Sequence, residues 1–149
     1  YFGLMLTPDG PKVVEYNARF GDPETQPILS MLETDLMDIF EAVIDERLDK
    51  IDVRFKDGFA CCIVIASGGY PEKYATGLPI SGLENIPADI TVYHAGTKRE
   101  NGKIVTSGGR VLGVTARGTT LEDAARRAYE GVAKIHFDNM HFRRDIGKK

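Results

Sequence analysis

The sequence is poor in the residue types and patterns that often indicate a function directly. It contains no tryptophan, two cysteines and three histidines among 149 residues, and its formal net charge is only -3. A net charge this small and negative gives no sign of the basic surface that binds nucleic acid. No apolar run approaches the roughly 20 residues that span a bilayer, and the first residues lack the pattern of a secretory signal. We therefore expect a cytoplasmic protein with no nucleic-acid or membrane partner.

The few cysteines and histidines also exclude common kinds of site. Cys61 and Cys62 are adjacent within the apolar run 59–66, so as strand neighbours they should point to opposite faces. No nearby cysteine or histidine completes a zinc-ligand set, and no histidine is paired with a serine or cysteine nucleophile motif. We expect two buried free thiols and no nucleophile.

The sequence does contain enough apolar residues to form a hydrophobic core. Hydrophobic residues make up 42% and charged residues 28%, which suits one typical domain or two small ones. Residues 2–6 and 12–17 are rich in β-formers and flank the turn Thr7-Pro8-Asp9-Gly10. Such a hairpin would expose apolar side chains on one face, so something outside it should cover that face.

Two helices are predicted after the hairpin. Asp22 can act as an N-cap, but Pro27 cannot bond back four residues, so the first continuous helix should begin near Thr25. Thr34 or Asp35 can cap a second helix. Its apolar residues recur at helical spacing along one stripe, which we interpret as core: Leu36, Ile39, Phe40, Val43, Ile44 and Leu48.

Strand patterns dominate the second half of the chain. Residues 59–66 form a nearly continuous apolar run that is typical of a buried strand, and residues 110–116 supply another strand. Residues 90–95 and 103–106 are also strand-like. Asn101-Gly102 is a hairpin turn signal, and we expect it to connect these last two strands.

A final helix and a change of pattern define the predicted units. The capping box Thr119-Thr120-Leu121-Glu122 should begin a helix that ends near His136, with small and aliphatic residues on its buried face. Upstream, residues 49–58 change to alternating charge and a turn signal. We place a boundary there, which divides the chain into residues 1–55 and residues 56–149.

The strand 12–17 runs into polar side chains that suit a metal and phosphate site. Residues two apart in a strand share a face, so Glu15, Asn17 and Arg19 project together if the strand persists. Carboxylate and amide oxygens are hard ligands for Mg²⁺, and a guanidinium can grip phosphate oxygens in bidentate fashion. A solvated ion pair between Glu15 and Arg19, with Asn17 starting a turn, explains the same spacing. Spacing alone leaves both interpretations open.

Two glycine-rich loops contain groups that can bind phosphate. Ser67-Gly68-Gly69-Tyr70-Pro71 follows the buried strand, but no lysine follows at phosphate-loop spacing, which favours a plain turn. Thr106-Ser107-Gly108-Gly109-Arg110 combines hydroxyls, glycines and a fixed cation. By composition alone, a hairpin turn with a solvated arginine explains this second loop more simply.

Several motifs together resemble those of the glycinamide ribonucleotide synthetase family of ATP-grasp ligases. The most specific is Glu15-Tyr16-Asn17-Ala18-Arg19-Phe20-Gly21-Asp22-Pro23-Glu24-Thr25-Gln26. The resemblance continues through Ala66-Ser67-Gly68-Gly69-Tyr70-Pro71, His94-Ala95-Gly96-Thr97, Gly108-Gly109-Arg110-Val111-Leu112 and Arg144-Asp145-Ile146-Gly147. It covers essentially the whole chain.

The resemblance implies a fold and a site. The fold is α/β (α+β): residues 1–55 would end an ATP-grasp core as a hairpin plus helices, and residues 56–149 would form a small mixed or antiparallel sheet domain with a packed helix. ATP would be a co-substrate, with Mg²⁺ or Mn²⁺ held by Glu15 and Asn17, and with Arg19 assisting catalysis and binding the ATP phosphates. A place near the ribose phosphate of the substrate is implied for Ser107, Gly108, Gly109 and Arg110.

The reaction implied by the resemblance joins glycine to 5-phosphoribosylamine with ATP hydrolysis, through a glycyl phosphate, in de novo purine biosynthesis. In that family an amino-terminal domain, an ATP-covering lid and most of the ATP-grasp core would precede Tyr1, so we expect the 149-residue chain alone to be inactive. Two alternatives remain: a non-catalytic α/β folding or interaction module whose hairpin docks onto a partner, or another ATP-grasp carboxylate–amine ligase.

Overall fold

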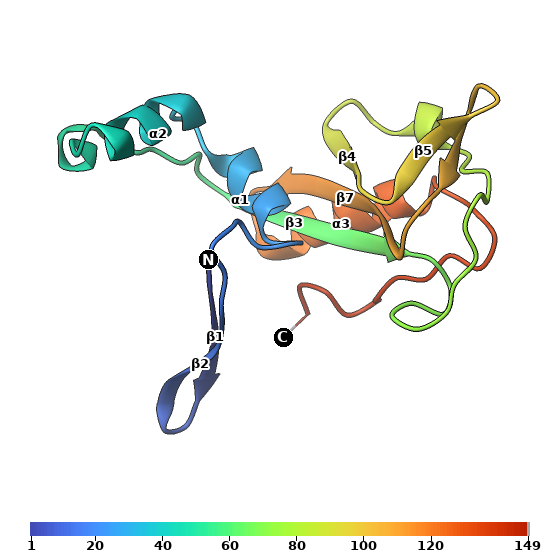
Figure 1. Ribbon diagram of the computed structural model, residues 1–149, viewed down its shortest axis with the longest axis horizontal. Helices are drawn as coiled ribbons and strands as arrows, with labels where there is room; N and C mark the ends of the chain where they lie inside the picture. The colour runs from blue at the N-terminus through green and yellow to red at the C-terminus, as the bar shows by residue number, and fades with distance from the viewer. Residues whose placement is uncertain (149) are drawn as a thin grey trace.

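The chain folds into an extended amino-terminal part and a more compact carboxyl-terminal part, which a computed structural model describes for residues 1–148 (Figure 1). Lys149, the last residue of the second predicted region, lies outside the described residues. The amino-terminal part consists of a hairpin, two short helices and a 3-10 turn: β1 (Phe2–Thr7), β2 (Gly10–Tyr16), α1 (Thr25–Met31), α2 (Leu36–Ile44) and η1 (Leu48–Lys50).

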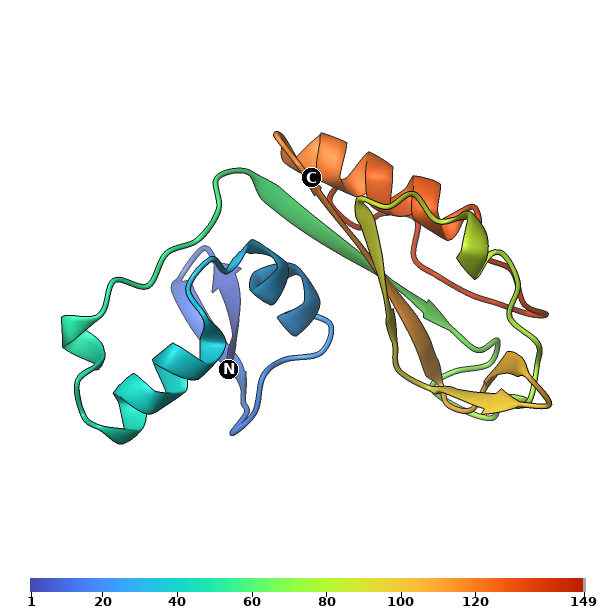
Figure 2. The same cartoon turned by 90° about the horizontal axis from the view of Figure 1, so that it is seen from above.

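A three-stranded antiparallel sheet lies at the centre of the carboxyl-terminal part. Its order is β3 (Phe59–Ala66), β7 (Arg110–Gly118) and β4 (Ile90–His94), with β7 in the middle. Helix α3 (Leu121–Val132) covers one face of this sheet (Figure 2). The long connection from β3 contains η2 (Leu83–Asn85), and β5 (Thr97–Glu100) pairs with β6 (Lys103–Thr106) in a separate hairpin. These antiparallel sheets with a packed helix confirm the predicted fold class.

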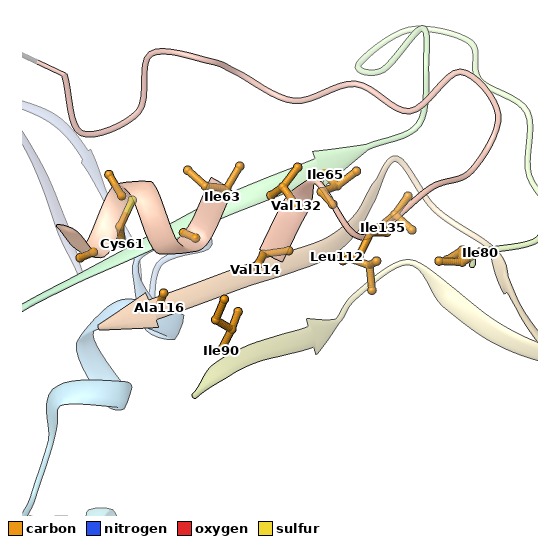
Figure 3. Close-up of a cluster of buried hydrophobic side chains, with 14 of the residues drawn as sticks. Cys61, Ile63, Ile65, Ile80, Ile90, Leu112, Val114, Ala116, Val132 and Ile135 are labelled. Carbon is orange, nitrogen blue, oxygen red and sulfur yellow. The ribbon is translucent and has the colours of Figure 1, made fainter. Parts of the chain in front are cut away.

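The main core lies between α3 and the sheet (Figure 3). Alternate residues of β3, among them Ile63 and Ile65, point toward α3 and are fully buried. Small residues on α3 let the helix come close to the strands. At Gly131 a built Cβ would lie only 2.8 Å from Val114 Cγ1, so the absence of a side chain there permits the contact.

The opposite face of the sheet meets α1. Cys61 belongs to the α3 core, whereas Cys62 pairs in register with Thr115 and faces α1. Both thiols are free and buried, as predicted. Burial raises the pKa of the Cys62 thiol to about 11, so this side chain is a protonated packing group at neutral pH.

One predicted hairpin has the wrong partner strand. Asn101 and Gly102 do form the turn, both with positive φ (49° and 77°), but they connect β5 to β6. The strand predicted at 90–95 is β4, which pairs with β7 instead. Strand β5 was missed because its residues Thr97-Lys98-Arg99-Glu100 are all polar and show no apolar alternation.

The last helix is shorter than predicted and begins one residue later. Its N-cap is Thr120, whose hydroxyl accepts a hydrogen bond from the Asp123 backbone N–H at 3.1 Å, and not Thr119. It ends at Val132 and not near His136. Ile135 is nevertheless buried in the same core after the helix has ended.

The apolar stripe on α2, predicted as core, is largely exposed: Leu36 and Ile39 are half-buried, and none of its members is fully buried. The helix begins as predicted, because the Asp35 carboxylate accepts a hydrogen bond from Met37 N–H at 2.8 Å. Only Ala42 is buried, however, while Val43 is 54% and Ile44 79% exposed. Figures 1 and 2 show α2 extending away from the sheet, and residues 1–148 leave most of its stripe uncovered. Within the same residues, no helix is long and apolar enough to cross a membrane.

Candidate functional site

The predicted metal ligands lie where the β1–β2 hairpin ends. Strand β2 stops at Tyr16, but the ladder continues one residue further, because Asn17 N–H donates to the Tyr1 carbonyl at 2.8 Å. Glu15 pairs with Gly3, and a Cβ built on Gly3 would lie 2.9 Å from Glu15 Cγ. Glycine at this position therefore leaves room for the Glu15 side chain across the hairpin.

A β-bulge directly precedes Glu15. The register shifts between Gly3 and Leu4, which pair with Glu15 and Val13, and Val14 is left over. Bulges turn side chains away from simple alternation and occur often beside functional sites. The bulge residue, Val14, is neither a glycine nor a turn former, so sequence alternation could not have predicted the bulge.

Arg19 is not on the strand. Residues 18 and 19 form a bend, and Arg19 Nη1 donates to the Phe20 carbonyl at 2.8 Å. Strand alternation therefore does not place Glu15, Asn17 and Arg19 on one face, because the strand does not persist to Arg19. The turn, and not the strand period, sets where this guanidinium lies.

An open hollow of about 550 Å³ lies between the two parts of the chain. The amino-terminal part contributes Arg19, Asp22 and Gln26, and the carboxyl-terminal part contributes His94 and Arg110. The structure thus brings two predicted site residues, Arg19 and Arg110, to one hollow. Glu15, Asn17 and the loop residues 107–109 do not line it.

Arg110 is the residue that connects the two sides of this hollow. Its Nη1 donates to the Asp22 carbonyl at 2.7 Å and to Asp22 Oδ2 at 3.1 Å, and its Nε donates to the Tyr70 hydroxyl at 3.1 Å. These contacts, chiefly the one with Tyr70, raise the pKa of Arg110, which keeps its charge. Gln26 Nε2 donates to the other Asp22 oxygen at 3.0 Å. Asp22, predicted as a helix cap, is instead the centre of this network.

The glycine loop before β7 is packed against backbone. Gly108 and Gly96 approach so closely that a Cβ on Gly96 would lie 2.6 Å from Gly108 Cα. A Cβ on Gly109 would collide with the Tyr70 ring. Ser107 is exposed, and its N–H donates to the Gly96 carbonyl at 2.7 Å. The glycines therefore have a structural role that is visible here, whatever else the loop binds.

Sequence reasoning missed three contributors to this region. Tyr70 was placed in a plain turn, Asp22 was assigned to capping, and His94 was given no role, although it lines the hollow and its Nδ1 lies 3.0 Å from Thr97 Oγ1. All three fall inside the motifs that carry the family resemblance. That membership was the one available signal, because none has a distinctive spacing.

The side chains of Glu15 and Asn17 suit a hard cation. Glu15 is exposed, and among the described residues neither its carboxylate nor the Asn17 amide has a hydrogen-bond partner. Two uncommitted oxygen donors fit a divalent ion that takes its other ligands elsewhere. Within residues 1–148, no group of three or more histidine, cysteine, aspartate or glutamate side chains could hold a metal by itself.

Comparison with known families identifies the chain. A family model described as "Phosphoribosylglycinamide synthetase, ATP-grasp (A) domain" matches residues 1–25, so this segment is similar to part of an ATP-grasp domain. A second, described as "Phosphoribosylglycinamide synthetase, C domain", matches residues 60–149. The chain therefore belongs to the phosphoribosylglycinamide synthetase family.

Individual relatives agree with this assignment. The phosphoribosylamine–glycine ligase of Clostridium acetobutylicum is 48% identical over 99% of this chain and 35% of its own length. A bifunctional purine biosynthetic protein of Pichia angusta is 48% identical over all of this chain and 19% of its own length. The crystal structure of the Thermotoga maritima phosphoribosylamine–glycine ligase matches with a TM-score of 0.75 and 37% identity, over 97% of this chain and 35% of that one. The chain thus spans about a third of the length of the curated ligases that it matches.

Proposed function

We propose that this chain is the carboxyl-terminal part of a cytoplasmic phosphoribosylamine–glycine ligase, which joins glycine to 5-phosphoribosylamine with ATP hydrolysis in purine biosynthesis. The observation that carries the proposal is the segment 15–26, which contains the oxygen donors Glu15 and Asn17 and presents Arg19 to a hollow between two parts of the chain. Residues 1–55 would complete the ATP-grasp domain, and residues 56–149 would form the carboxyl-terminal domain.

The chemistry explains why such residues would be needed. A carboxylate is a poor electrophile, so a glycine oxygen first takes the γ-phosphoryl group of ATP, giving glycyl phosphate and ADP. The amine nitrogen then attacks the carbonyl carbon, a C–N bond forms, the C–O bond to phosphate breaks, and the amine loses a proton. Positioning and charge stabilisation supply most of the catalysis in phosphoryl transfer.

Each proposed site residue would act on charge. Arg19 would bind phosphate oxygens and offset the charge of the transferring group. Glu15 and Asn17 would hold Mg²⁺ or Mn²⁺, which supplies neutralisation of the ATP phosphates. Ser107, Gly108 and Gly109 would lie near the ribose phosphate, and the exposed Ser107 hydroxyl supports that role. Arg110 was predicted to join them, and its contacts with Asp22 and Tyr70 support a second role, in positioning.

The exposed apolar surfaces support a longer ligase as the working form. Leu6 is 83% and Ile44 79% exposed, on the hairpin and on α2. Exposure of this kind is typical of surfaces that a partner covers. The phosphoribosylamine–glycine ligases that the chain matches are about three times as long as this chain, and we propose that their preceding domains supply the cover. The same surfaces would also serve the alternative of an interaction module.

The isolated 149-residue chain should not catalyse the reaction. The adenine pocket, the lid and the domain for the amine substrate would belong to the preceding polypeptide. We expect no ADP release that depends on glycine and phosphoribosylamine, measured by a coupled ADP assay with a complete ligase as positive control. Robust turnover by the isolated chain would show that the assignment of these missing parts is wrong.

In a full-length ligase carrying this chain, Glu15→Ala should abolish the reaction and leave the fold nearly intact. The reason is that the exposed carboxylate would serve the metal and not the core. ADP release measures the loss of the reaction, Mn²⁺ titration followed by electron paramagnetic resonance measures the loss of metal binding, and circular dichroism shows whether the fold is kept. Glu33→Gln is the matched control, since Glu33 is also exposed and its side chain has no hydrogen-bond partner among residues 1–148. Normal turnover by a folded Glu15→Ala protein would remove Glu15 from the metal site.

A further inference from the structure

The contacts of Arg110 join segments that are far apart in the chain. Arg110 begins β7, and it reaches Asp22, 88 residues earlier, with two hydrogen bonds from one nitrogen. On its other side it donates to Tyr70, 40 residues earlier. Its side chain is 41% exposed, so the ion pair alone would contribute little stability. Three bonds from one planar guanidinium nevertheless fix geometry better than a single surface pair.

The turn that Arg110 holds is the one that carries Arg19. Within it, Thr25 donates both its N–H and its hydroxyl to the Gly21 carbonyl, which makes residues 21–25 a tight unit. Gln26 Nε2 occupies the remaining Asp22 oxygen, so both carboxylate oxygens are bonded to neighbours. Arg19 is three residues from Asp22 and lines the same hollow.

The Tyr70 side of the network is equally constrained. The Tyr70 ring lies over Gly109, where any Cβ would collide with it, and Gly109 is the residue directly before Arg110. The Ser67 hydroxyl donates to the Gly108 carbonyl at 2.9 Å, which connects the loop that bears Tyr70 to the glycine loop. The tyrosine hydroxyl is thereby held at the place where the Arg110 Nε–H points.

We propose that Arg110 and Tyr70 are positioning residues, which lock the turn 20–25 onto the carboxyl-terminal sheet and so set the place of Arg19 at the hollow. This inference rests on the proposed function for its kinetic consequence, but its structural content does not. It gives Arg110 a role in the phosphoryl-transfer half of the reaction. A ligand of the ribose phosphate would instead act on the amine substrate.

The test uses a full-length ligase carrying this chain, with Arg110→Ala, Arg110→Lys and Tyr70→Phe. Arg99→Ala is the matched control, because Arg99 is an exposed arginine of β5 whose side chain has no hydrogen bond or ion pair in the described part of the chain. Misplacing a catalytic group by 1 Å can cost about 100-fold, so we expect kcat of Arg110→Ala to fall by about that factor. Its KM for phosphoribosylamine should stay within about twofold of wild type, since a positioning residue does not contact that substrate. Arg110→Lys should recover part of the rate, and Tyr70→Phe should show the same signature with a smaller loss.

Hydrogen–deuterium exchange of the same proteins gives a readout without catalysis. The backbone amides of residues 20–26 should exchange faster in Arg110→Ala and Tyr70→Phe than in wild type. In Arg99→Ala their exchange rates should equal those of wild type. Unchanged exchange there, or a KM for phosphoribosylamine that rises at least about tenfold while kcat is kept, would overturn the proposal and assign Arg110 to substrate phosphate. Should Arg110→Ala unfold, Tyr70→Phe decides, because it removes one hydroxyl and keeps the ring over Gly109. An inactive wild-type protein would refute the proposed function, whereas the exchange measurement would still decide whether Arg110 positions the turn.

Discussion

Helices α2 and α3 have the same kind of amphipathic pattern and opposite surroundings. Each begins with a side-chain N-cap, Asp35 or Thr120, and each has an apolar stripe at helical spacing. Five residues of α3 are buried against the sheet, whereas α2 buries only Ala42. The difference teaches that periodicity predicts a face that needs cover. It does not predict which part of the polypeptide supplies that cover.

The same contrast separates the two parts of the molecule. The carboxyl-terminal part encloses a continuous core in which Ile63, Val111 and Val114 are fully buried. In the amino-terminal hairpin, Phe2 is 67% and Tyr16 70% exposed, although their rings pack edge to face at 5.1 Å. The carboxyl-terminal part thus buries its apolar side chains by its own contacts, whereas much of the apolar surface of the hairpin is left uncovered by residues 1–148.

A pair of isoleucine truncations gives the largest expected difference. In the 149-residue chain, Ile63→Ala should lower the free energy of unfolding by about 2–5 kcal/mol, because it opens a cavity in a packed core. Ile44→Ala should change it by no more than about 0.5 kcal/mol, because that side chain is already in water. Urea unfolding followed by circular dichroism measures both.

The same pair in a full-length ligase sharpens the comparison. There the Ile44→Ala cost should rise if preceding domains cover α2, while the Ile63→Ala cost should stay the same. Equal costs for the two variants in the short chain would mean that α2 is covered by its own chain, contrary to the structure.

How far the sequence could predict this molecule follows from the same contrast. Local rules were sufficient for β3, for the start of α1 at Thr25 and for the cap at Asp35, because each depends on neighbours in the chain. Strand β5 was not predicted, because its polar residues show no periodic hydrophobic pattern. The division at residue 56 stays a prediction about domains.

The residues of the candidate site stay a prediction, and their geometry could not have been predicted from the sequence. Glu15, Asn17 and Arg19 were proposed from their chemistry together with the family resemblance, whereas the bulge at Val14 and the bend at Arg19 depend on the hairpin's register. The bond from Arg110 to Asp22 spans 88 residues and depends on how the two parts dock. No local pattern encodes that docking.

The pH dependence of stability tests how well the amino-terminal part seals the second face of the sheet. Burial raises the Cys62 pKa from 9.0 to about 11 in the folded chain. The pKa of Cys62 in the folded chain lies above its value in the unfolded chain. The protonated thiol's contribution to the free energy of unfolding is therefore fully present below pH 9 and is lost as the pH rises toward 11. We expect wild type to lose up to about 2 kcal/mol more than Cys62→Ala over this range, at about 1.36 kcal/mol per pKa unit. Urea unfolding at pH 8 to 11 gives the difference, and parallel pH profiles would mean that water reaches the thiol behind α1.

The two N-caps should give the smallest effects and the sharpest contrast in kind. Removing a capping side chain costs about 1 kcal/mol of helix stability, so Thr120→Ala and Asp35→Ala lose similar local energy. Because α3 is packed into the core, the Thr120→Ala loss should appear in the global free energy of unfolding. Because α2 is not, Asp35→Ala should leave global unfolding nearly unchanged and speed hydrogen exchange only at residues 37–45. A global loss of equal size in both variants would show that α2 unfolds together with the sheet, and the two parts would then be one cooperative unit.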